Sequence, residues 1–296
     1  MQDIPPAGGN NRPNQLPDQV FREISAIALE DAGLNIPETK KPLVTSRLAK
    51  RLRATGVEDY QSYMKLVTSD ANSAERQRMV MALTTNVSGF FRERHHFEHL
   101  ATTLAQYDTP AGQQKIRIWS SGCASGEEPY SIAATCLRHL PSALAERTLI
   151  LGTDINTDCL ARAKAAEYAP EHVAGISPKD HEALFETGTI GTVKEALKSM
   201  IRLRHLNLHA DWPMEHKFDA IFCRNVTIYF AEAHRDRLIC RFADALKPGG
   251  TLYLGHAESI PNPAEIGFSL SGTTTYMRLQ TEAEDSAAIL NDGTHR

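Results

Sequence analysis

The sequence predicts an α/β protein in which a parallel sheet covered by helices follows a small all-helical domain. Two observations carry this prediction. From about residue 113 to residue 280, apolar segments of strand length alternate with segments of helical periodicity, which is typical of a parallel sheet. Between about residues 18 and 107, apolar residues recur at helical spacing instead.

Composition sets the broad class of protein. The chain has 296 residues, of which 42% are hydrophobic and 23% charged, with a net charge of -4, as in an ordinary globular protein of one or two domains. No apolar run approaches the roughly 18 to 20 residues of a membrane span, and the polar, proline-rich start does not resemble a signal peptide. We therefore expect a cytoplasmic protein without membrane insertion. The five cysteines and twelve histidines lack disulfide or metal-ligand spacing, so we predict no metal.

The amino-terminal part divides into a tail and a helical domain. Residues 1–17 are rich in Pro, Gly, Asn and Gln and are predicted to be disordered. The domain at 18–107 contains three helical patterns, around 20–28, 43–52 and 60–67, separated by turn residues such as Gly33 and Gly56. At the other end of the chain, residues 281–296 are polar and predicted to form a flexible tail.

The second domain, 113–280, is predicted to be a Rossmann-like sheet. Its expected strands are 116–119, 149–153, 218–223 and 251–254, and its expected helices are 129–139, 158–166 and 235–246. The alternation weakens between 169 and 205, where several glycines surround short segments. We expect an inserted subdomain there, in the form of a small antiparallel sheet.

The loop after the first strand, residues 122–126, consists of small residues that let the backbone approach a ligand. It lacks the G-x-G-x-x-G pattern of dinucleotide sites, and Glu127 and Glu128 follow it at the start of a helix. Acids there repel a diphosphate and attract a cation. This indicates S-adenosylmethionine, which carries a sulfonium and an ammonium and no phosphate. The alternative is that the two acids only complement the helix dipole.

Polar residues also follow two later strands. Asp154 ends the second strand, where an acid can accept both ribose hydroxyls; the alternative is a cap of the next helix. Arg224 and Asn225 end the strand at 218–223. Base-modifying methyltransferases usually place an Asn/Asp-Pro-Pro-aromatic motif at this edge, and its absence argues against a nucleic-acid substrate.

These motifs resemble the chemotaxis receptor methyltransferase (CheR) family over about residues 20 to 280. The shared motifs are Thr84-Thr-Asn86 with Phe90-Phe-Arg92, Trp119-Ser with Ser125-Gly-Glu-Glu-Pro-Tyr-Ser131, Asp154-Ile155, Phe218-Asp-Ala-Ile-Phe-Cys-Arg-Asn-Val226 with Ile228-Tyr-Phe230, and Lys247-Pro-Gly-Gly250 with Gly255-His-Ala-Glu258. The resemblance implies a methyltransferase that uses S-adenosylmethionine, releases S-adenosylhomocysteine, and methylates glutamate side chains of methyl-accepting chemotaxis receptors. Its partner is then the cytoplasmic helical domain of those receptors.

The resemblance also implies roles for residues in the first half of the cofactor site. Asn86, Ser88 and Arg92 reach over the cofactor from the amino-terminal side, and Ser88 stands where relatives often have Thr. Glu127 binds the ammonium group and Asp154 binds the ribose. Arg92 is also a candidate for orienting the substrate carboxylate, because a planar guanidinium suits such a group.

Further residues complete the site by the same resemblance. Asn207 and Leu208 flank the adenine, and Arg224 with Asn225 completes the pocket. Tyr229 is a candidate for the methyl-acceptor pocket, with a packed aromatic side chain as the alternative. In some relatives the segment equivalent to 169–205 pairs with a carboxyl-terminal receptor peptide by strand addition, although it is shorter here.

A basic stretch lies in the helical domain. Residues 40–53 contain no acid, and Arg47, Lys50 and Arg51 fall on one face of a predicted helix, with Arg53 close by. These four cations are predicted to bind an acidic receptor surface; the alternative is a solvated face. The net charge of -4 argues against nucleic acid as the partner. A catalytically silent sensor of the methyl donor is the remaining alternative.

Overall fold

The computed structural model describes residues 15–69, 74–106 and 115–280, and within them no helix is both long and apolar enough to cross a membrane. The chain forms two compact units, Met1–Thr85 and Asn86–Arg296. The boundary expected at residue 107 is therefore wrong. Helix α5 (His95–Leu104) belongs to the second unit because its buried face, Phe97, Leu100 and Leu104, joins the apolar cluster around the sheet.

The first unit is all-helical, as predicted. It contains α1 (Asp18–Ala32), the short η1 (Glu38–Lys40), α2 (Lys41–Thr55), α3 (Tyr60–Thr68) and α4 (Ala74–Leu83). Gly33 and Gly56 end α1 and α2 with positive φ angles of 69° and 72°, a conformation that glycine adopts without strain. The disordered tail predicted at residues 1–17 is too long, since Leu16 is buried. Residues 1–14 and 281–296, which include the rest of this tail and the predicted carboxyl-terminal tail, lie outside the described part of the chain.

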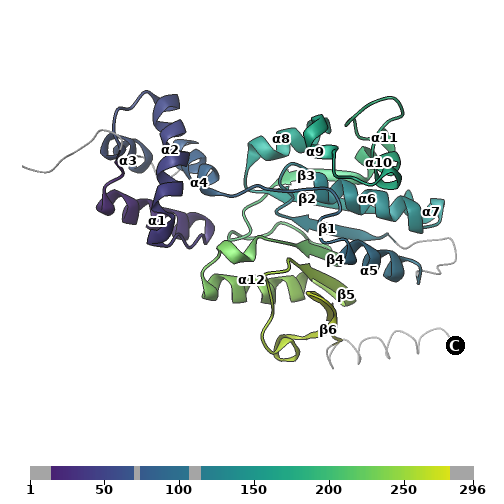
Figure 1. The fold of residues 1–296 in the computed structure, drawn as a ribbon. Coiled ribbons are helices and arrows are strands. Elements are labelled where there is room, and N and C mark those ends of the chain that lie inside the picture. Colours follow the sequence, from purple (N-terminus) through teal and green to yellow (C-terminus); the bar gives the residue numbers. More distant parts are fainter. Residues whose placement is uncertain (1–14, 70–73, 107–114, 281–296) are drawn as a thin grey trace, which may run out of the picture. The chain divides into compact units, whose positions relative to one another are not determined.

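The second unit is built on a seven-stranded sheet (Figure 1). The strands are β1 (Arg117–Ser121), β2 (Leu149–Asp154), β3 (Ile201–His205), β4 (Phe218–Cys223), β5 (Leu246–Leu254), β6 (Phe268–Gly272) and β7 (Thr275–Arg278). Their order is β3-β2-β1-β4-β5-β7-β6; β1 to β5 are parallel to one another, and β7 is antiparallel to both of its neighbours, β5 and β6. The order reverses between β1 and β4, and ligands of open α/β sheets bind at the carboxyl ends of strands at such a point.

Alternating side chains of the central strands give the sheet two apolar faces. Ile118 and Phe222 face a cluster that includes α5 and α6 (Glu127–His139), and Trp119 and Ile221 face α12 (Glu232–Ala245). Figure 1 shows α5 and α6 on one side of the sheet and α12 on the other. The remaining helices are α7 (Ser142–Ala145), α8 (Thr157–Ala165), α9 (Pro170–Val173), α10 (Pro178–Leu184), α11 (Glu195–Met200), η2 (Thr227–Tyr229) and η3 (Pro263–Ile266).

The predicted antiparallel sheet at 169–205 is wrong. This fully described segment contains α9, α10 and α11, with isolated antiparallel bridges at Glu167–Thr192 and Phe185–Val193, before it enters β3. Strand β3 pairs in parallel with β2 and so belongs to the main sheet. Without this antiparallel sheet, the segment lacks the strand edge to which a receptor peptide was expected to add. The predicted strand at 218–223 is confirmed, and the other strands and helices of the sheet occur with shifted ends.

Candidate functional site

The loop after β1 is fixed by backbone contacts at the carboxyl edge of the sheet. The N–H groups of Gly122 and Cys123 donate to the carbonyl oxygen of Thr153 in β2 over 2.7 and 2.8 Å. Gly126 then starts α6 with a φ of 99°, and a Cβ there would lie 2.9 Å from both the Ala163 Cβ and the Tyr168 hydroxyl. Only glycine fits this position, so the loop keeps its backbone close to the strand ends.

Asp154 lies at the end of β2 and joins two loops. Its Oδ2 accepts the N–H of Ala124 and its Oδ1 accepts the N–H of Asn156, each over 2.8 Å. Burial raises the pKa of Asp154, and the two backbone donors oppose that rise. Asn156, not Asp154, caps α8, so the helix-cap alternative for Asp154 is wrong. A buried carboxylate with remaining lone pairs is thus held at the edge where a ligand is expected.

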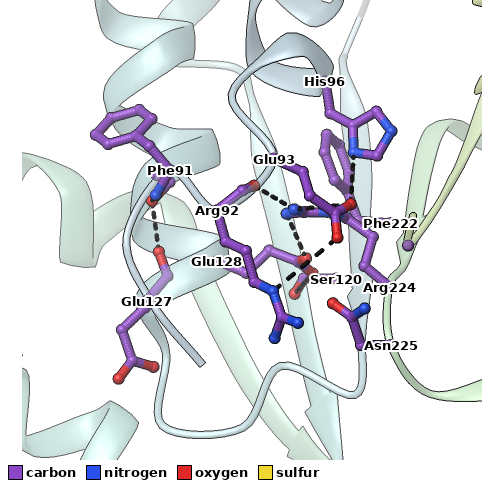
Figure 2. Close-up of polar contacts among 12 residues, drawn as sticks. Phe91, Arg92, Glu93, His96, Ser120, Glu127, Glu128, Phe222, Arg224 and Asn225 are labelled. Carbon is purple, nitrogen blue, oxygen red and sulfur yellow. Dashed lines mark hydrogen bonds and ion pairs between the residues drawn. The ribbon is translucent and has the colours of Figure 1, made fainter. Parts of the chain in front are cut away.

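The two acids at the start of α6 have different surroundings. Glu127 is buried, and both of its carboxylate oxygens accept from the Ser125 hydroxyl over 2.9 Å. Glu128 instead accepts from the Ser120 hydroxyl over 2.6 Å and pairs with Arg224 over 3.2 Å. Figure 2 shows the Glu127 carboxylate pointing away from the cluster that contains Glu128. The expectation that both acids attract a cationic ligand is therefore corrected for Glu128, because the Ser120 hydroxyl and the Arg224 guanidinium already bind its carboxylate.

Arg224 is the centre of a buried ionic cluster. Its side chain is only 3% exposed and lies 3.3 Å from Glu93 and 3.2 Å from Glu128, and it also donates to the backbone carbonyl of Arg92. The guanidinium further lies over the ring of Phe97. Because these protein partners surround it, Arg224 is better described as a support between chain segments than as the cofactor ligand that we predicted.

Glu93 also belongs to this cluster, although it was not predicted from the sequence, where only its charge marks it. It adopts a φ of 54°, uncommon for a residue with a side chain. Burial opposes its ionisation, but a hydrogen bond from His256 and the charge of Arg224 outweigh burial and lower the pKa of Glu93 to about 2. His96 is fully buried beside it, with Nδ1 3.5 Å from Glu93, and burial lowers the pKa of His96 to about 3. The cluster thus combines an ionised acid with a neutral histidine.

Asn207 and Leu208 follow β3, next to the end of β2, where Leu206 N–H donates to the Asp154 carbonyl. The Asn207 side chain accepts the N–H of His209 over 2.9 Å. The Leu208 carbonyl accepts from Arg241 over 2.8 Å and from Trp212 over 3.3 Å. These two predicted residues therefore share the carboxyl edge with Asp154. Two residues that were not predicted fix this loop: Arg241 from α12 and Trp212 from within the loop.

The remaining predicted site residues lie on two segments of the same unit. Asn86, Ser88 and Arg92 lie on the segment that opens it, and all three are partly exposed. Arg92 Nη1 donates to the Val87 carbonyl over 3.3 Å, and its side chain remains 38% exposed. Asn225, with a φ of 58°, and the half-buried Tyr229 lie on the segment after β4. Arg92 Nε also lies 4.0 Å from Glu93 Oε1, and Figure 2 shows the Arg92 guanidinium beside the cluster that contains Glu93.

The cations predicted on α2 divide into two kinds. Arg47 donates to the Leu83 carbonyl and the Thr85 hydroxyl over 2.5 and 2.8 Å, and Arg51 forms a two-pronged pair with Glu75 at 3.0 and 2.6 Å. Both arginines hold α4 within the first unit, so the prediction that they form a free cationic face is corrected. Lys50 and Arg53 are exposed.

The residues at the carboxyl edge fit a cationic nucleoside. Asp154 offers carboxylate oxygens for hydroxyl groups, and Glu127 offers a buried negative charge at the loop. A diphosphate would meet negative charge here. The arrangement therefore suits a positively charged, phosphate-free ligand.

Comparison with known proteins agrees with this geometry. Residues 86–277 match the family described as CheR methyltransferase, SAM binding domain, and residues 19–84 match its all-alpha domain. The chain belongs to the CheR methyltransferase family. Both matched regions follow the division at Thr85, so the family boundary and the compact units agree.

Relatives of this CheR-family chain cover most of its length. It is 41% identical to a probable chemotaxis protein methyltransferase of Rhizobium etli, over 83% of this chain and 94% of the relative. It is 38% identical to the chemotaxis protein methyltransferase of Klebsiella aerogenes, over 88% and 90% of the two chains. The Escherichia coli protein of that name is 36% identical over 88% and 91%. The chain is an S-adenosylmethionine-dependent methyltransferase.

Proposed function

We propose that this CheR-family enzyme transfers a methyl group from S-adenosylmethionine to glutamate side chains on the cytoplasmic helical domain of methyl-accepting chemotaxis receptors. The product on the receptor is a glutamate methyl ester. The observation that carries this proposal is the buried Asp154 carboxylate, which backbone N–H groups of two loops hold at the edge where the strand order reverses. The relatives that cover most of this chain are chemotaxis protein methyltransferases.

The cofactor roles follow from where each residue lies. Asp154 accepts the ribose hydroxyls and Glu127 the ammonium group, since both are buried acids beside the loop after β1. Asn207 and Leu208 contact the adenine from the adjacent strand end. Asn225 approaches from the end of β4 on the other side of β1. These contacts would use four neighbouring strands of one sheet edge.

Asn86, Ser88 and Arg92 belong to the segment that precedes α5, and we assign them to the cofactor from this side. Their partial exposure leaves polar atoms accessible to a ligand. Arg92 has the additional role of orienting a carboxylate, because its side chain is 38% exposed while its backbone carbonyl is fixed by Arg224. Tyr229, half-buried after β4, lines the methyl-acceptor site.

The reaction requires placement more than proton transfer. Bound S-adenosylmethionine supplies a methyl group on a positively charged sulfur. A glutamate side chain, with an ordinary pKa near 4.3, is already ionised at neutral pH, so no general base is needed. The residues of this chain then have to hold the carboxylate in line with the methyl–sulfur bond and remove part of its water, and such positioning supplies about 7 to 11 kcal/mol in favourable cases.

Of the four cations of α2 that were predicted to bind the receptor, two remain candidates for that role. Lys50 and Arg53 are exposed, and so are Ser46 and Leu43, one and two turns before Lys50. These four residues, which we call the outer face of α2, recur at the spacing of one helix side. A cationic face with an apolar residue at its end suits an acidic, amphipathic receptor helix.

The proposed function is tested with the purified enzyme, tritiated S-adenosylmethionine and membranes that contain a chemotaxis receptor. We expect alkali-labile label on receptor glutamates, released as volatile methanol, and much less of it with the Asp154→Asn enzyme at a subsaturating concentration of S-adenosylmethionine. RNA and DNA serve as alternative acceptors. Stable label on nucleic acid with none on receptor would overturn the proposal, and so would the absence of label on all three acceptors.

A further inference from the structure

Glu258 is a buried acid that lies four residues after the end of β5 and receives hydrogen bonds from two chain segments. The residue is only 4% exposed. Oε2 accepts the N–H of Asn225 over 2.8 Å and the N–H of Gly255 over 2.6 Å. The carboxylate therefore connects the ends of β4 and β5.

The second carboxylate oxygen of Glu258 accepts hydrogen bonds from the next residues of the segment after β4. Oε1 accepts the N–H of Val226 over 3.0 Å, of Thr227 over 2.7 Å and of Ile228 over 3.3 Å, and also the Thr227 hydroxyl over 2.8 Å. Four consecutive backbone N–H groups thus converge on one carboxylate, an arrangement that backbone forms around anions. The same contacts satisfy the donors at the start of η2.

The backbone that Glu258 holds includes an uncommon conformation. Asn225 has a φ of 58°, in the left-handed region that few residues other than glycine and asparagine adopt. Gly255 also leaves no room for change, because a Cβ there would lie 2.6 Å from the Asn225 Nδ2 and 2.8 Å from the Glu258 Oε2. The orientation of Asn225 is therefore fixed from both sides.

We propose that Glu258 is a positioning residue for the methyl-transfer site, because its carboxylate holds residues 225–228 in the conformation that directs the Asn225 side chain toward the cofactor. This rests on the cofactor role given to Asn225 under the proposed function. Glu258 itself does not touch the reacting atoms. It acts through the backbone it binds.

The Glu258→Gln substitution isolates this role because the two side chains have nearly the same shape. A carboxylate offers only acceptors, whereas an amide offers one oxygen and one NH₂ donor. In either orientation of the amide, the NH₂ group faces backbone N–H donors, at Asn225 and Gly255 or at Val226 and Thr227. The segment should then shift even though the volume is unchanged. Glu265→Gln, an exposed acid in η3, is the matched control.

The experiment is a double-mutant cycle on the full-length enzyme, with the dissociation constant of S-adenosylhomocysteine measured by calorimetry and kcat measured with receptor membranes. Glu258→Gln is expected to weaken S-adenosylhomocysteine binding about tenfold, as for one lost charge-assisted hydrogen bond. In the Asn225→Ala background the same substitution should change binding by less than about threefold, because its effect passes through Asn225. Glu265→Gln should match the wild-type enzyme.

Equal losses in both backgrounds would overturn the inference, because they would indicate a general structural effect. Wild-type affinity of the Glu258→Gln enzyme would overturn it as well. If that variant does not fold, Gly255→Ala displaces the same contact while Glu258 stays intact, and it should show the same dependence on Asn225. A wild-type enzyme that neither binds S-adenosylhomocysteine nor methylates receptor would instead show that the proposed function has failed.

Discussion

Arg224 at the end of β4 and Glu93 before α5 form a buried ion pair, with 3.3 Å between Nη2 and Oε2. Glu128 in the first turn of α6 lies 3.2 Å from the same guanidinium. Together these three residues join three segments that are far apart in the sequence and carry proposed site residues, because Arg92 precedes Glu93, Glu127 precedes Glu128 and Asn225 follows Arg224. This part of the site is therefore held together by protein contacts, independently of any ligand.

Replacing Arg224 by Gln should strongly destabilise the second unit. The substitution leaves the Glu93 and Glu128 carboxylates buried without their shared cation, and breaking such a pair costs about 3–5 kcal/mol. The free energy of unfolding, measured by urea denaturation at pH 7, checks this. Arg237→Gln removes an exposed arginine of α12 and should stay within about 0.5 kcal/mol of wild type. A loss below about 1 kcal/mol for Arg224→Gln would contradict the buried-cluster description.

Replacing Asp154 by Asn should weaken cofactor binding with little change of the fold. The amide oxygen can accept only one of the two backbone N–H groups that the carboxylate now binds, and the charge is lost. We expect the S-adenosylhomocysteine dissociation constant to rise by about tenfold to a hundredfold, as for the loss of a charged hydrogen bond. Calorimetry measures it, with the exposed Asp158→Asn as control. Unchanged affinity would remove Asp154 from the site.

The free energy of unfolding should decrease as the pH is lowered from about 6.5 to 4.5, because of His96. Burial lowers the pKa of His96 to about 3, whereas the unfolded chain binds this proton near pH 6.5. The unfolded state therefore gains a proton first as the pH falls, and stability is lost by up to about 1.4 kcal/mol per pH unit. Glu93, with its pKa lowered to about 2, adds to the loss only below about pH 4.5.

Denaturation curves at several pH values test the His96 prediction. A His96→Gln enzyme should show a shallower decline between pH 6.5 and 4.5, whatever its stability at pH 7. The neighbouring His95 is exposed, so His95→Gln should keep the wild-type slope. Equal slopes in all three proteins would mean that another group governs the decline.

Reversing the charges of Lys50 and Arg53 should reduce receptor methylation at low salt. Both side chains are exposed on the outer face of α2, and electrostatic attraction there raises association rates by about tenfold or more. The double Glu variant should lose about that factor in kcat/KM for receptor membranes, keep its S-adenosylhomocysteine affinity, and approach wild type at high salt.

Two comparisons separate this effect from simple changes of charge or fold. Arg22→Glu with Lys65→Glu reverses two exposed cations on α1 and α3 and should leave kcat/KM close to wild type. Arg47→Glu or Arg51→Glu should instead lower the melting temperature of the first unit, because these arginines bind α4 and its end. Equal methylation by the Lys50/Arg53 variant and wild type at low salt would exclude the outer face as a docking surface.

The sequence contained enough local information for the strands and for several site positions. Apolar runs such as 218–223 predict strands, and in parallel strands the residues that follow, such as Asp154 and Asn225, meet at one edge. The family motifs supplied the cofactor and the reaction. The domain boundary was harder, because the apolar spacing of α5 shows that one face is buried but not against which partner. The prediction of an antiparallel sheet at residues 169–205 was wrong for a related reason, since short helices and short strands have similar patterns over a few residues.

What the sequence determined by itself was the set of groups at the sheet edge: two acids after a small-residue loop, an acid after β2, and Arg-Asn after β4. Only the tertiary structure decided how these groups are used. Arg224 pairs with Glu93 and Glu128, Arg51 pairs with Glu75, and Glu258 binds the backbone after β4. Each of these contacts joins residues distant in the chain, and a charged side chain looks the same in a sequence whether it meets solvent, a ligand or a buried partner. Folding determines which partner it meets, because burying a charge without one costs several kcal/mol.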